Sequence, residues 1–372
     1  DSTIERHSVT KTNNEKYSIN INAHSPVNDG ESVILNVGGI IGSGSEFKCT
    51  GSRVTSYTMT NGSNINVTSD LTSDSSIYAG GIAGSISNTS DSSEMSKVVN
   101  TGDITITETN SNSVMIGGIA GNVSGGKYYA MYNVGELNLN GGNPSLTYSI
   151  GGVFGQAETN SSQTTLSLSK FINFSDINIK PTATGDIKPS KSRIRFAGGV
   201  IGRIIGTASQ LEGGYTLARI LYDGRYLGVQ NQDNQAINGI AYMESINPST
   251  FNNVFFVFDF LPYSNYSNAS AQTSGAMTIV DGSTNLTNTN GVYGGIEYAQ
   301  LVNVLNKRLN KYIVDTESSS VEFVKTSGVS EYIFNLPTQF KLDNNRSMIP
   351  AVSLFDSQKL AKGAKFIIII RI

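Results

Sequence analysis

Gly117-Gly118-Ile119-Ala120-Gly121 is one copy of the motif that decides the fold of this chain. The pattern is two glycines, an aliphatic residue, a further residue and a third glycine, and it returns at intervals of tens of residues. Such self-similarity is typical of repeat architectures. The five copies begin with Gly38 and Gly39, Gly80 and Gly81, Gly117 and Gly118, Gly151 and Gly152, and Gly198 and Gly199, and weaker echoes lie at 238–241 and 294–296.

A second motif alternates with the first. It places an asparagine, any residue, a small residue and a polar residue before an apolar-polar-apolar triplet, as in Asn100-Thr101-Gly102-Asp103-Ile104-Thr105-Ile106. The triplet predicts a strand with one buried face. The asparagine suits a turn because Asn tolerates left-handed backbone angles. The four copies begin at Asn61, Asn100, Asn133 and Asn173.

The two motifs predict an all-β fold, a parallel β-helix (β-solenoid) of Gly-rich repeats. Each half-repeat is roughly 20 residues long, about the length of one coil, so we expect two coils in each repeat. Stacked rungs lie about 4.8 Å apart, which leaves no room for a Cβ at a tight corner and accounts for the glycines. The alternative is a set of Gly-rich hairpin turns in an antiparallel sandwich, but the regular alternation of two motifs favours the solenoid. The aliphatic residues should then form an internal ladder of Ile40, Ile82, Ile119, Val153 and Val200.

One repeat resembles the GLUG repeat of bacterial surface proteins and adhesins. It consists of Gly117-Gly118-Ile119-Ala120-Gly121-Asn122-Val123-Ser124-Gly125-Gly126 and continues to Tyr132-Asn133-Val134-Gly135-Glu136-Leu137. The cysteine of the family's Asn-Cys-Tyr-like step is absent here, although Val99-Asn100-Thr101-Gly102-Asp103-Ile104 keeps the Thr-Gly-x-Ile end. The resemblance covers roughly residues 15–296. It implies a right-handed parallel β-helix at a cell surface, with no catalytic residue.

The pattern divides the chain into an N-terminal arm or cap (1–16), a solenoid domain (17–296) and a small C-terminal α+β domain (297–372) that acts as a cap or assembly element. Near the end of the solenoid, the aromatic run 254–260 predicts a strand buried on both faces, or part of a subunit contact. The C-terminal domain begins with a predicted amphipathic helix whose polar face carries Lys307, Arg308 and Lys311. Its apolar residues at helical spacing are Tyr298, Leu301, Val302, Leu305, Leu309, Tyr312 and Ile313.

The last residues of the chain predict a strand that must be paired. High β propensity with one charge and no Pro or Gly would make a free segment of this kind prone to aggregate. Its partner is either the chain's own C-terminal domain or the open edge of a neighbouring subunit. The apolar residues of this possible assembly strand are Phe366, Ile367, Ile368, Ile369, Ile370 and Ile372.

Composition narrows the classes of function. The net charge of −3 and the absence of any basic run argue against nucleic acid as a partner. One cysteine, Cys49, precludes a disulfide framework within the chain, and two histidines, His7 and His24, form no Cys/His cluster for a metal; we expect no cofactor. No apolar run approaches the length of about 20 residues that a membrane-spanning helix needs. Because the sequence starts at Asp1, we expect that an N-terminal targeting or pro-segment has been removed.

No spaced catalytic set is recognisable, so we expect no catalytic residue. Asp103, Glu136 and Asp176 occupy equivalent positions before successive strands, which indicates a turn role in which each carboxylate accepts local backbone hydrogen bonds. We therefore expect an extracellular structural or adhesive protein, a subunit of a surface filament, layer or adhesin, that associates with itself, with other surface proteins or with a glycan. The alternatives are a carbohydrate-active β-helix, tailspike-like or lyase-like, and a virion fibre protein.

Overall fold

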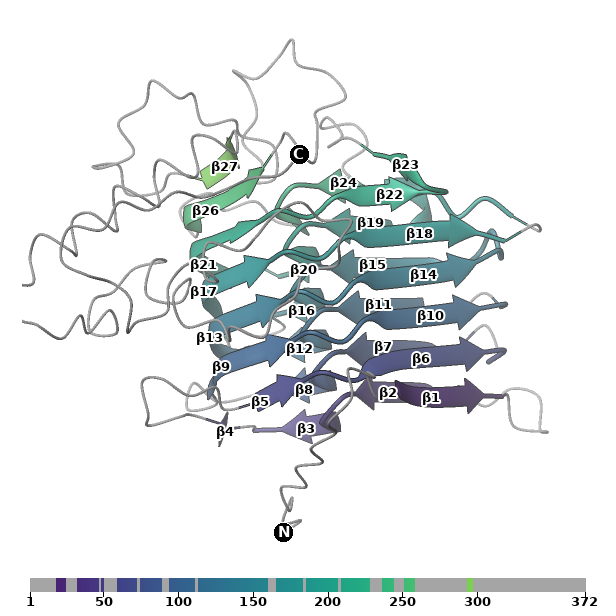
Figure 1. Cartoon of the computed structure of the whole chain (residues 1–372), viewed down its shortest axis with the longest axis horizontal. Coiled ribbons are helices and arrows are strands. Elements are labelled where there is room, and N and C mark those ends of the chain that lie inside the picture. Colours follow the sequence, from purple (N-terminus) through teal and green to yellow (C-terminus); the bar gives the residue numbers. More distant parts are fainter. Residues whose placement is uncertain are drawn as a thin grey trace, which may run out of the picture.

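The strands of the computed structural model form four parallel sheets, A to D, that wrap around one core (Figure 1). The parallel β-helix predicted from the sequence is therefore confirmed. The structure describes residues 18–24, 32–46, 48–49, 59–71, 74–88, 94–110, 113–159, 165–182, 185–206, 209–227, 236–243, 251–257 and 293–296.

The strands are numbered in chain order, and each belongs to one wall of the solenoid. Sheet A contains β1 (Ser18–Ala23), β6 (Asn64–Ser69), β10 (Ile104–Glu108), β14 (Leu137–Gly141), β18 (Ile177–Pro181), β22 (Ile220–Tyr222) and β23 (Arg225–Tyr226). Sheet B contains β2 (Ile34–Gly38), β7 (Ser76–Gly80), β11 (Ser113–Gly117), β15 (Thr147–Gly151), β19 (Arg195–Gly198) and β24 (Ile237–Asn238). Sheet C contains β3 (Ile41–Ser45), β8 (Ala83–Ser87), β12 (Ala120–Ser124), β16 (Phe154–Glu158), β20 (Ile201–Ile205) and β25 (Ala241–Met243). Sheet D contains β4 (Lys48–Cys49), β5 (Met59–Asn61), β9 (Glu94–Asn100), β13 (Gly126–Asn133), β17 (Leu166–Asn173), β21 (Ser209–Thr216), β26 (Phe251–Val257) and β27 (Tyr293–Ile296).

One coil holds one whole repeat, so the expectation of two coils per repeat is wrong. Each coil contributes one strand to each sheet, as β10 to β13 do for sheets A to D in turn. The glycine motif lies at the corner between sheets B and C, and the asparagine is the last residue of the strand in sheet D. The motifs thus mark two corners of the same coil.

The predicted internal ladder forms at the B–C corner. The backbone amides of Ile82, Ile119 and Val153 donate to the carbonyls of the equivalent residues one coil on, Ile119, Val153 and Val200, at 2.9, 2.9 and 2.7 Å. All four side chains are fully buried. Ile40 is an exception, because its coil is the first and leaves its side chain 38% exposed.

The asparagines form a second, polar ladder inside the solenoid. The Nδ2 group of each donates to the side chain one coil on: Asn61 to Asn100 at 2.9 Å, Asn100 to Asn133 at 2.9 Å, and Asn133 to Asn173 at 3.1 Å. The ladder ends at Thr216, whose Oγ1 accepts from Asn173 at 3.2 Å. Because buried amides need partners, each coil holds the next one in register.

The asparagines lie at a turn as predicted, and Oδ1 of Asn61, Asn100 and Asn173 accepts from the backbone amide two residues on. None of them has a positive φ angle, so the left-handed backbone given as the reason is wrong. The left-handed residues lie three positions earlier, at Lys97, Ala130 and Lys170, where φ is 57°, 60° and 55°. They are left out of the paired positions of β9, β13 and β17, but the register is the same on either side: Tyr129 pairs with Ser96 and Met131 with Val98. The sequence does not mark these left-handed positions in sheet D, since Lys and Ala are not residues that favour left-handed backbone.

The glycine and asparagine motifs meet across the interior of each coil. A Cβ placed on Gly118 would lie 2.1 Å from Cγ of Asn133, and one on Gly81 would lie 2.2 Å from Cγ of Asn100. It would also collide with the next coil, since the carbonyl oxygen of Gly152 is 2.2 Å from the Cβ position of Gly118. Close approach, and not an unusual backbone angle, is what requires glycine here.

The last described strands of sheets A and D differ in what covers them. Asp223 and Gly224, with φ of 50° and 74°, turn β22 back into β23, which covers the edge of sheet A with an antiparallel strand. In sheet D, Val254, Phe255 and Phe256 are all buried, which confirms a strand buried on both faces over these residues. The predicted N-terminal arm, the predicted helix and the predicted strand 366–372 lie outside the described residues.

We predict that Gly118→Val destabilises the fold by about 4 kcal/mol or more, because both the Asn133 amide and the next coil must move. Gly62→Ala serves as the control, since the nearest atom to its Cβ position is at an ordinary 3.5 Å; it should change stability by less than about 0.5 kcal/mol. Urea denaturation followed by circular dichroism measures both. A Gly118→Val protein that unfolds at the wild-type midpoint would show that the cross-coil contact does not constrain this position.

We predict that Asn133→Ala costs about 2 to 4 kcal/mol, because it leaves the buried side chains of Asn100 and Asn173 with one partner fewer and opens a cavity. Asn138 is the matched control: it also belongs to an inter-coil pair, with Asn178 at 2.9 Å, but on the half-buried outer face. Asn138→Ala should cost less than about 1 kcal/mol. Equal losses from the two substitutions, measured by the same unfolding assay, would argue against the inner ladder.

Candidate functional site

The polar side chains of the solenoid wall form inter-coil columns. Asp103, Glu136 and Asp176 lie one above another, where each precedes its strand in sheet A. The amide of Glu136 donates to Oδ1 of Asp103 at 2.8 Å, and the amide of Asp103 donates to Oδ1 of Asn64 at 3.0 Å. Asp103 and Asp176 therefore accept backbone hydrogen bonds as expected, but from the neighbouring coil, in the second case from the amide of Arg219 at 3.3 Å. The carboxylate of Glu136 accepts from the side chain of Asn178.

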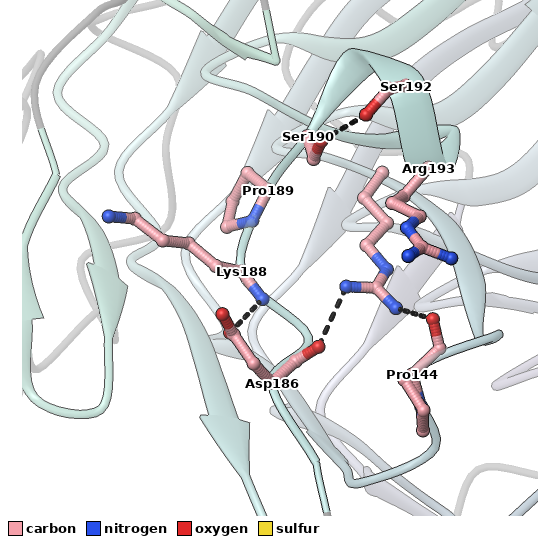
Figure 2. Close-up of a pocket in the computed structure, with 8 residues that line it drawn as sticks. Pro144, Asp186, Lys188, Pro189, Ser190, Ser192 and Arg193 are labelled. Carbon is pink, nitrogen blue, oxygen red and sulfur yellow. Dashed lines mark hydrogen bonds between the residues drawn. The ribbon is translucent and has the colours of Figure 1, made fainter.

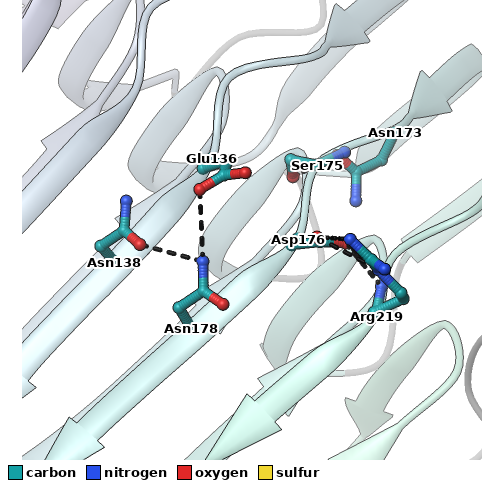
Figure 3. Close-up of polar contacts among 7 residues, drawn as sticks. All are labelled: Glu136, Asn138, Asn173, Ser175, Asp176, Asn178 and Arg219. Carbon is teal, nitrogen blue, oxygen red and sulfur yellow. Dashed lines mark hydrogen bonds and ion pairs between the residues drawn. The ribbon is translucent and has the colours of Figure 1, made fainter. Parts of the chain in front are cut away.

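The upper end of this column is an ion pair. Nε of Arg219 donates to both carboxylate oxygens of Asp176 at 3.0 and 3.1 Å, and Nη2 donates to Oδ2 (Figure 3). Nδ2 of Asn178 lies 3.5 Å from Oε2 of Glu136 and donates to Asn138 at 2.9 Å. Asp176 is held on both oxygens by a cation, which suits a structural link between coils and not a general base.

The outer face of sheet A carries two rows of small polar side chains. The inward positions of its strands hold core residues such as Ile104, Ile106, Leu137 and Leu139, so the residues between them point outward. Only one of the ten is charged. The outer rows are Asn20, Asn66, Thr105, Asn138 and Asn178, and Asn22, Thr68, Thr107, Asn140 and Lys180.

A pocket of about 470 Å³ opens beside sheet B. Its walls are the loop between β14 and β15 and the long connection between β18 and β19, which contains the short 3-10 helix η1 (Lys191–Arg193). The lining contains three basic side chains, Lys188, Arg193 and Arg195, and one acidic side chain, Asp186 (Figure 2). The lining residues are Pro144, Asp186, Lys188, Pro189, Ser190, Ser192, Arg193 and Arg195.

The side chain of Arg195 holds the two loops of the pocket together. It is 4% exposed, and it donates through Nε to the carbonyl of Leu146 at 2.8 Å, through Nη1 to that of Asp186 at 2.9 Å and through Nη2 to that of Pro144 at 2.5 Å. One guanidinium thus ties both loops to β19. Burial lowers the pKa of Arg195 from its usual value.

A carboxylate and two phenols complete the frame. The hydroxyl of Tyr222 and the amide of Lys188 donate to Asp186, and together they hold the pKa of that carboxyl below its usual value. Burial and then this bond raise the pKa of Tyr222 to about 12. The buried hydroxyl of Tyr148 donates to the carbonyl of Ile187 at 2.7 Å, and burial raises its pKa well above the usual value.

Of the two histidines, the structure describes His24, which lies beside an acidic side chain. His24 lies 2.9 Å from a carboxylate oxygen of Asp70 at the first coils, and these side chains are 72% and 51% exposed. Within the described ranges, no group of three or more His, Cys, Asp or Glu side chains could hold a metal ion. No helix in the same ranges is long and apolar enough to cross a membrane.

Sequence reasoning missed the pocket and Arg195. The available signal was spacing, because the interval from Gly151 to Gly198 exceeds that from Gly117 to Gly151 and therefore marks an insertion. Nothing in the sequence indicated that Arg195, the first residue of a strand, would turn inward beneath that insertion.

No protein-family model matches this chain, and neither a curated protein nor a solved structure is significantly similar to it. What the described residues establish is an all-β parallel solenoid with four walls.

We predict a pH-dependent role for the Tyr222–Asp186 hydrogen bond. Because the pKa of Asp186 is lower in the folded state, the bond stabilises the fold when the carboxyl is ionised, and this contribution is lost as the pH falls below about 4. The gap in unfolding free energy between wild type and Tyr222→Phe should be constant near neutral pH and shrink as the pH falls below about 4, through the lowered pKa of Asp186. Tyr78→Phe, on the outer face of sheet B, should show no such change. A gap that persists unchanged to the lowest pH contradicts the prediction.

Proposed function

We propose that this chain is an extracellular structural or adhesive protein that binds through the repeated outer surface of sheet A. The partner is a second copy of the protein, another surface protein or a glycan. The pocket beside sheet B supplies no catalytic set and is not part of this proposal.

The observation that carries the proposal is the register of the two outer rows. Strands of sheet A pair without a shift, so Asn66, Thr105 and Asn138 follow one another at the rung spacing of about 4.8 Å. Amide and hydroxyl groups spaced at this regular interval can form hydrogen bonds with the repeated polar groups of an extended polymer or of another solenoid. The rows contain one charge, Lys180, so binding would depend on hydrogen bonds and not on long-range attraction.

Two further points support this function. The repeating polar side chains inside the wall are engaged between coils, as the Asn ladder and the Asp176–Arg219 pair are, which is expected of a scaffold. The resemblance of residues 117–137 to the GLUG repeat points the same way, since that repeat occurs in bacterial surface proteins and adhesins. The alternative is a carbohydrate-active β-helix, tailspike-like or lyase-like.

The proposal predicts binding or assembly without turnover. Purified protein should either form ordered assemblies, visible by negative-stain electron microscopy and sedimentation velocity, or co-sediment with at least one insoluble glycan such as cellulose, chitin or peptidoglycan. Replacing three outer-row residues together, Asn66→Lys, Thr105→Lys and Asn138→Lys, should weaken that association about tenfold or more, a loss of at least about 1.4 kcal/mol.

The control carries the same added charge on the outer face of sheet C, through Ser85→Lys, Ser87→Lys and Ser124→Lys. It should associate like wild type, and both triple variants should keep the wild-type melting temperature. Association that survives the sheet A variant would assign the interaction to another surface. Release of reducing ends or unsaturated products from soluble polysaccharides by wild type would overturn the proposal in favour of the carbohydrate-active alternative.

A further inference from the structure

The pocket beside sheet B has the size of a small-ligand site and a charge opposite in sign to that of the chain. Its volume of about 470 Å³ lies within the range of pockets that hold small molecules. Three basic side chains and one acidic side chain give the lining a net charge of +2, whereas the whole chain carries −3. Positive charge gathered in one pocket of an acidic protein favours an anionic ligand.

The acidic side chain in the lining does not neutralise the cations. The carboxylate of Asp186 accepts from the hydroxyl of Tyr222 and, at 2.8 Å, from the amide of Lys188. Arg195 instead donates to the main-chain carbonyl of Asp186. In the part of the chain that the structure describes, no carboxylate forms an ion pair with any of the three basic side chains of the lining. Their charge is therefore available to a ligand.

The guanidinium of Arg195 is a rigid donor at the wall of the pocket. A guanidinium has five N–H groups, and Arg195 uses three of them on main-chain carbonyls. The other two have no partner among the described residues. Burying a charge that only neutral carbonyls meet is costly, and an anion in the pocket would offset that cost. Because the side chain is already fixed, binding would not have to order it.

A second arginine stands close to the first. Burial is the main cause of the lowered pKa of Arg195, and the charge of Arg193 acts in the same direction, which places the two cations near each other. The side chains of Arg193 and Lys188 are exposed and form no hydrogen bond or ion pair within the described ranges. Figure 2 shows Arg193 and Lys188 on opposite sides of the pocket. An anion beside the two arginines would relieve their repulsion.

The uncharged part of the lining indicates which kind of anion fits. Oγ of Ser190 and Oγ of Ser192 lie 3.0 Å apart, so one hydroxyl hydrogen is used between them and the other remains for a ligand. Pro144 and Pro189 add apolar ring surfaces. A sugar acid combines a carboxylate, a carbon ring and hydroxyl groups in one unit. The side chain of an acidic peptide residue offers the carboxylate without the neighbouring hydroxyls.

We propose that this pocket binds a uronate residue of an acidic glycan. The carboxylate accepts from Arg193 and from the two remaining N–H groups of Arg195, as charge-assisted hydrogen bonds. The sugar ring lies against Pro189, and its hydroxyls meet Ser192 and the ammonium group of Lys188. The pocket does not use the outer rows of sheet A, so this site goes beyond the proposed function and does not depend on it.

Isothermal titration calorimetry of the full chain at low ionic strength, where charge interactions are least screened, tests the site. The probes are trimers of galacturonate, glucuronate and mannuronate. At least one should bind one to one with a Kd of about 1 mM or tighter, and its methyl ester, which has lost the charge, about tenfold or more weakly. Arg193→Gln should weaken the binding about tenfold or more, and Lys188→Gln about threefold. Both replaced side chains are exposed, so the melting temperature should not change.

The matched control is Lys127→Gln, which removes an exposed positive charge from sheet D and should bind like wild type. The sheet A triple variant should also keep the one-to-one binding, so that failure of one proposal is distinguishable from failure of the other.

Three results would overturn the proposal: no binding of any trimer, equal binding of the methyl ester, or unchanged binding by Arg193→Gln. Two further results would also overturn it. Sulfate or phosphate that binds as tightly as the best trimer would show a site for a simple oxyanion, and tighter binding of hexaglutamate would assign the pocket to an acidic protein segment.

Discussion

The contact between the second glycine of each pair and the asparagine on the opposite corner determines the cross-section of the solenoid. Gly118 and Asn133 approach so closely that one additional carbon on the glycine would overlap the amide. The two corners of each coil are consequently drawn together across the core, and sheets B and C meet there at a sharp edge. A coil with any larger residue at the glycine position would have to be wider than its neighbours, and the flat stacking would be lost.

The same asparagines also determine the vertical spacing and register. Each donates to the next coil and accepts from the one below, so the buried amides satisfy one another at the repeat distance of the sheets. Apolar ladders such as Ile82–Ile119–Val153 contribute burial but tolerate sliding. A hydrogen-bonded ladder does not, because a slip of one residue would leave unpaired amides in the core.

Where the repeat is interrupted, the solenoid acquires its individual features. The insertion between β18 and β19 is held by Arg195, which donates to three carbonyls, and it lines a pocket beside sheet B. The outer faces differ as well: sheet A presents short polar side chains, and sheet D presents Tyr132, Ile172 and their neighbours. A polar outer face can remain in water, whereas an apolar outer face needs a covering layer. The two faces therefore suit different roles within one regular frame.

The repeated motifs by themselves determined that the chain forms a parallel solenoid and that Ile82, Ile119, Val153 and Val200 stack inside it, because a period of identical patterns has few packing solutions. Only the tertiary structure decided how many strands make a coil, since two motifs separated by similar distances fit either one coil or two. The inner Asn ladder, the left-handed backbone at Ala130 and the inward direction of Arg195 could not be predicted from the sequence either. Each depends on contacts between residues tens of positions apart, and local propensity carries no information about which of those residues become neighbours.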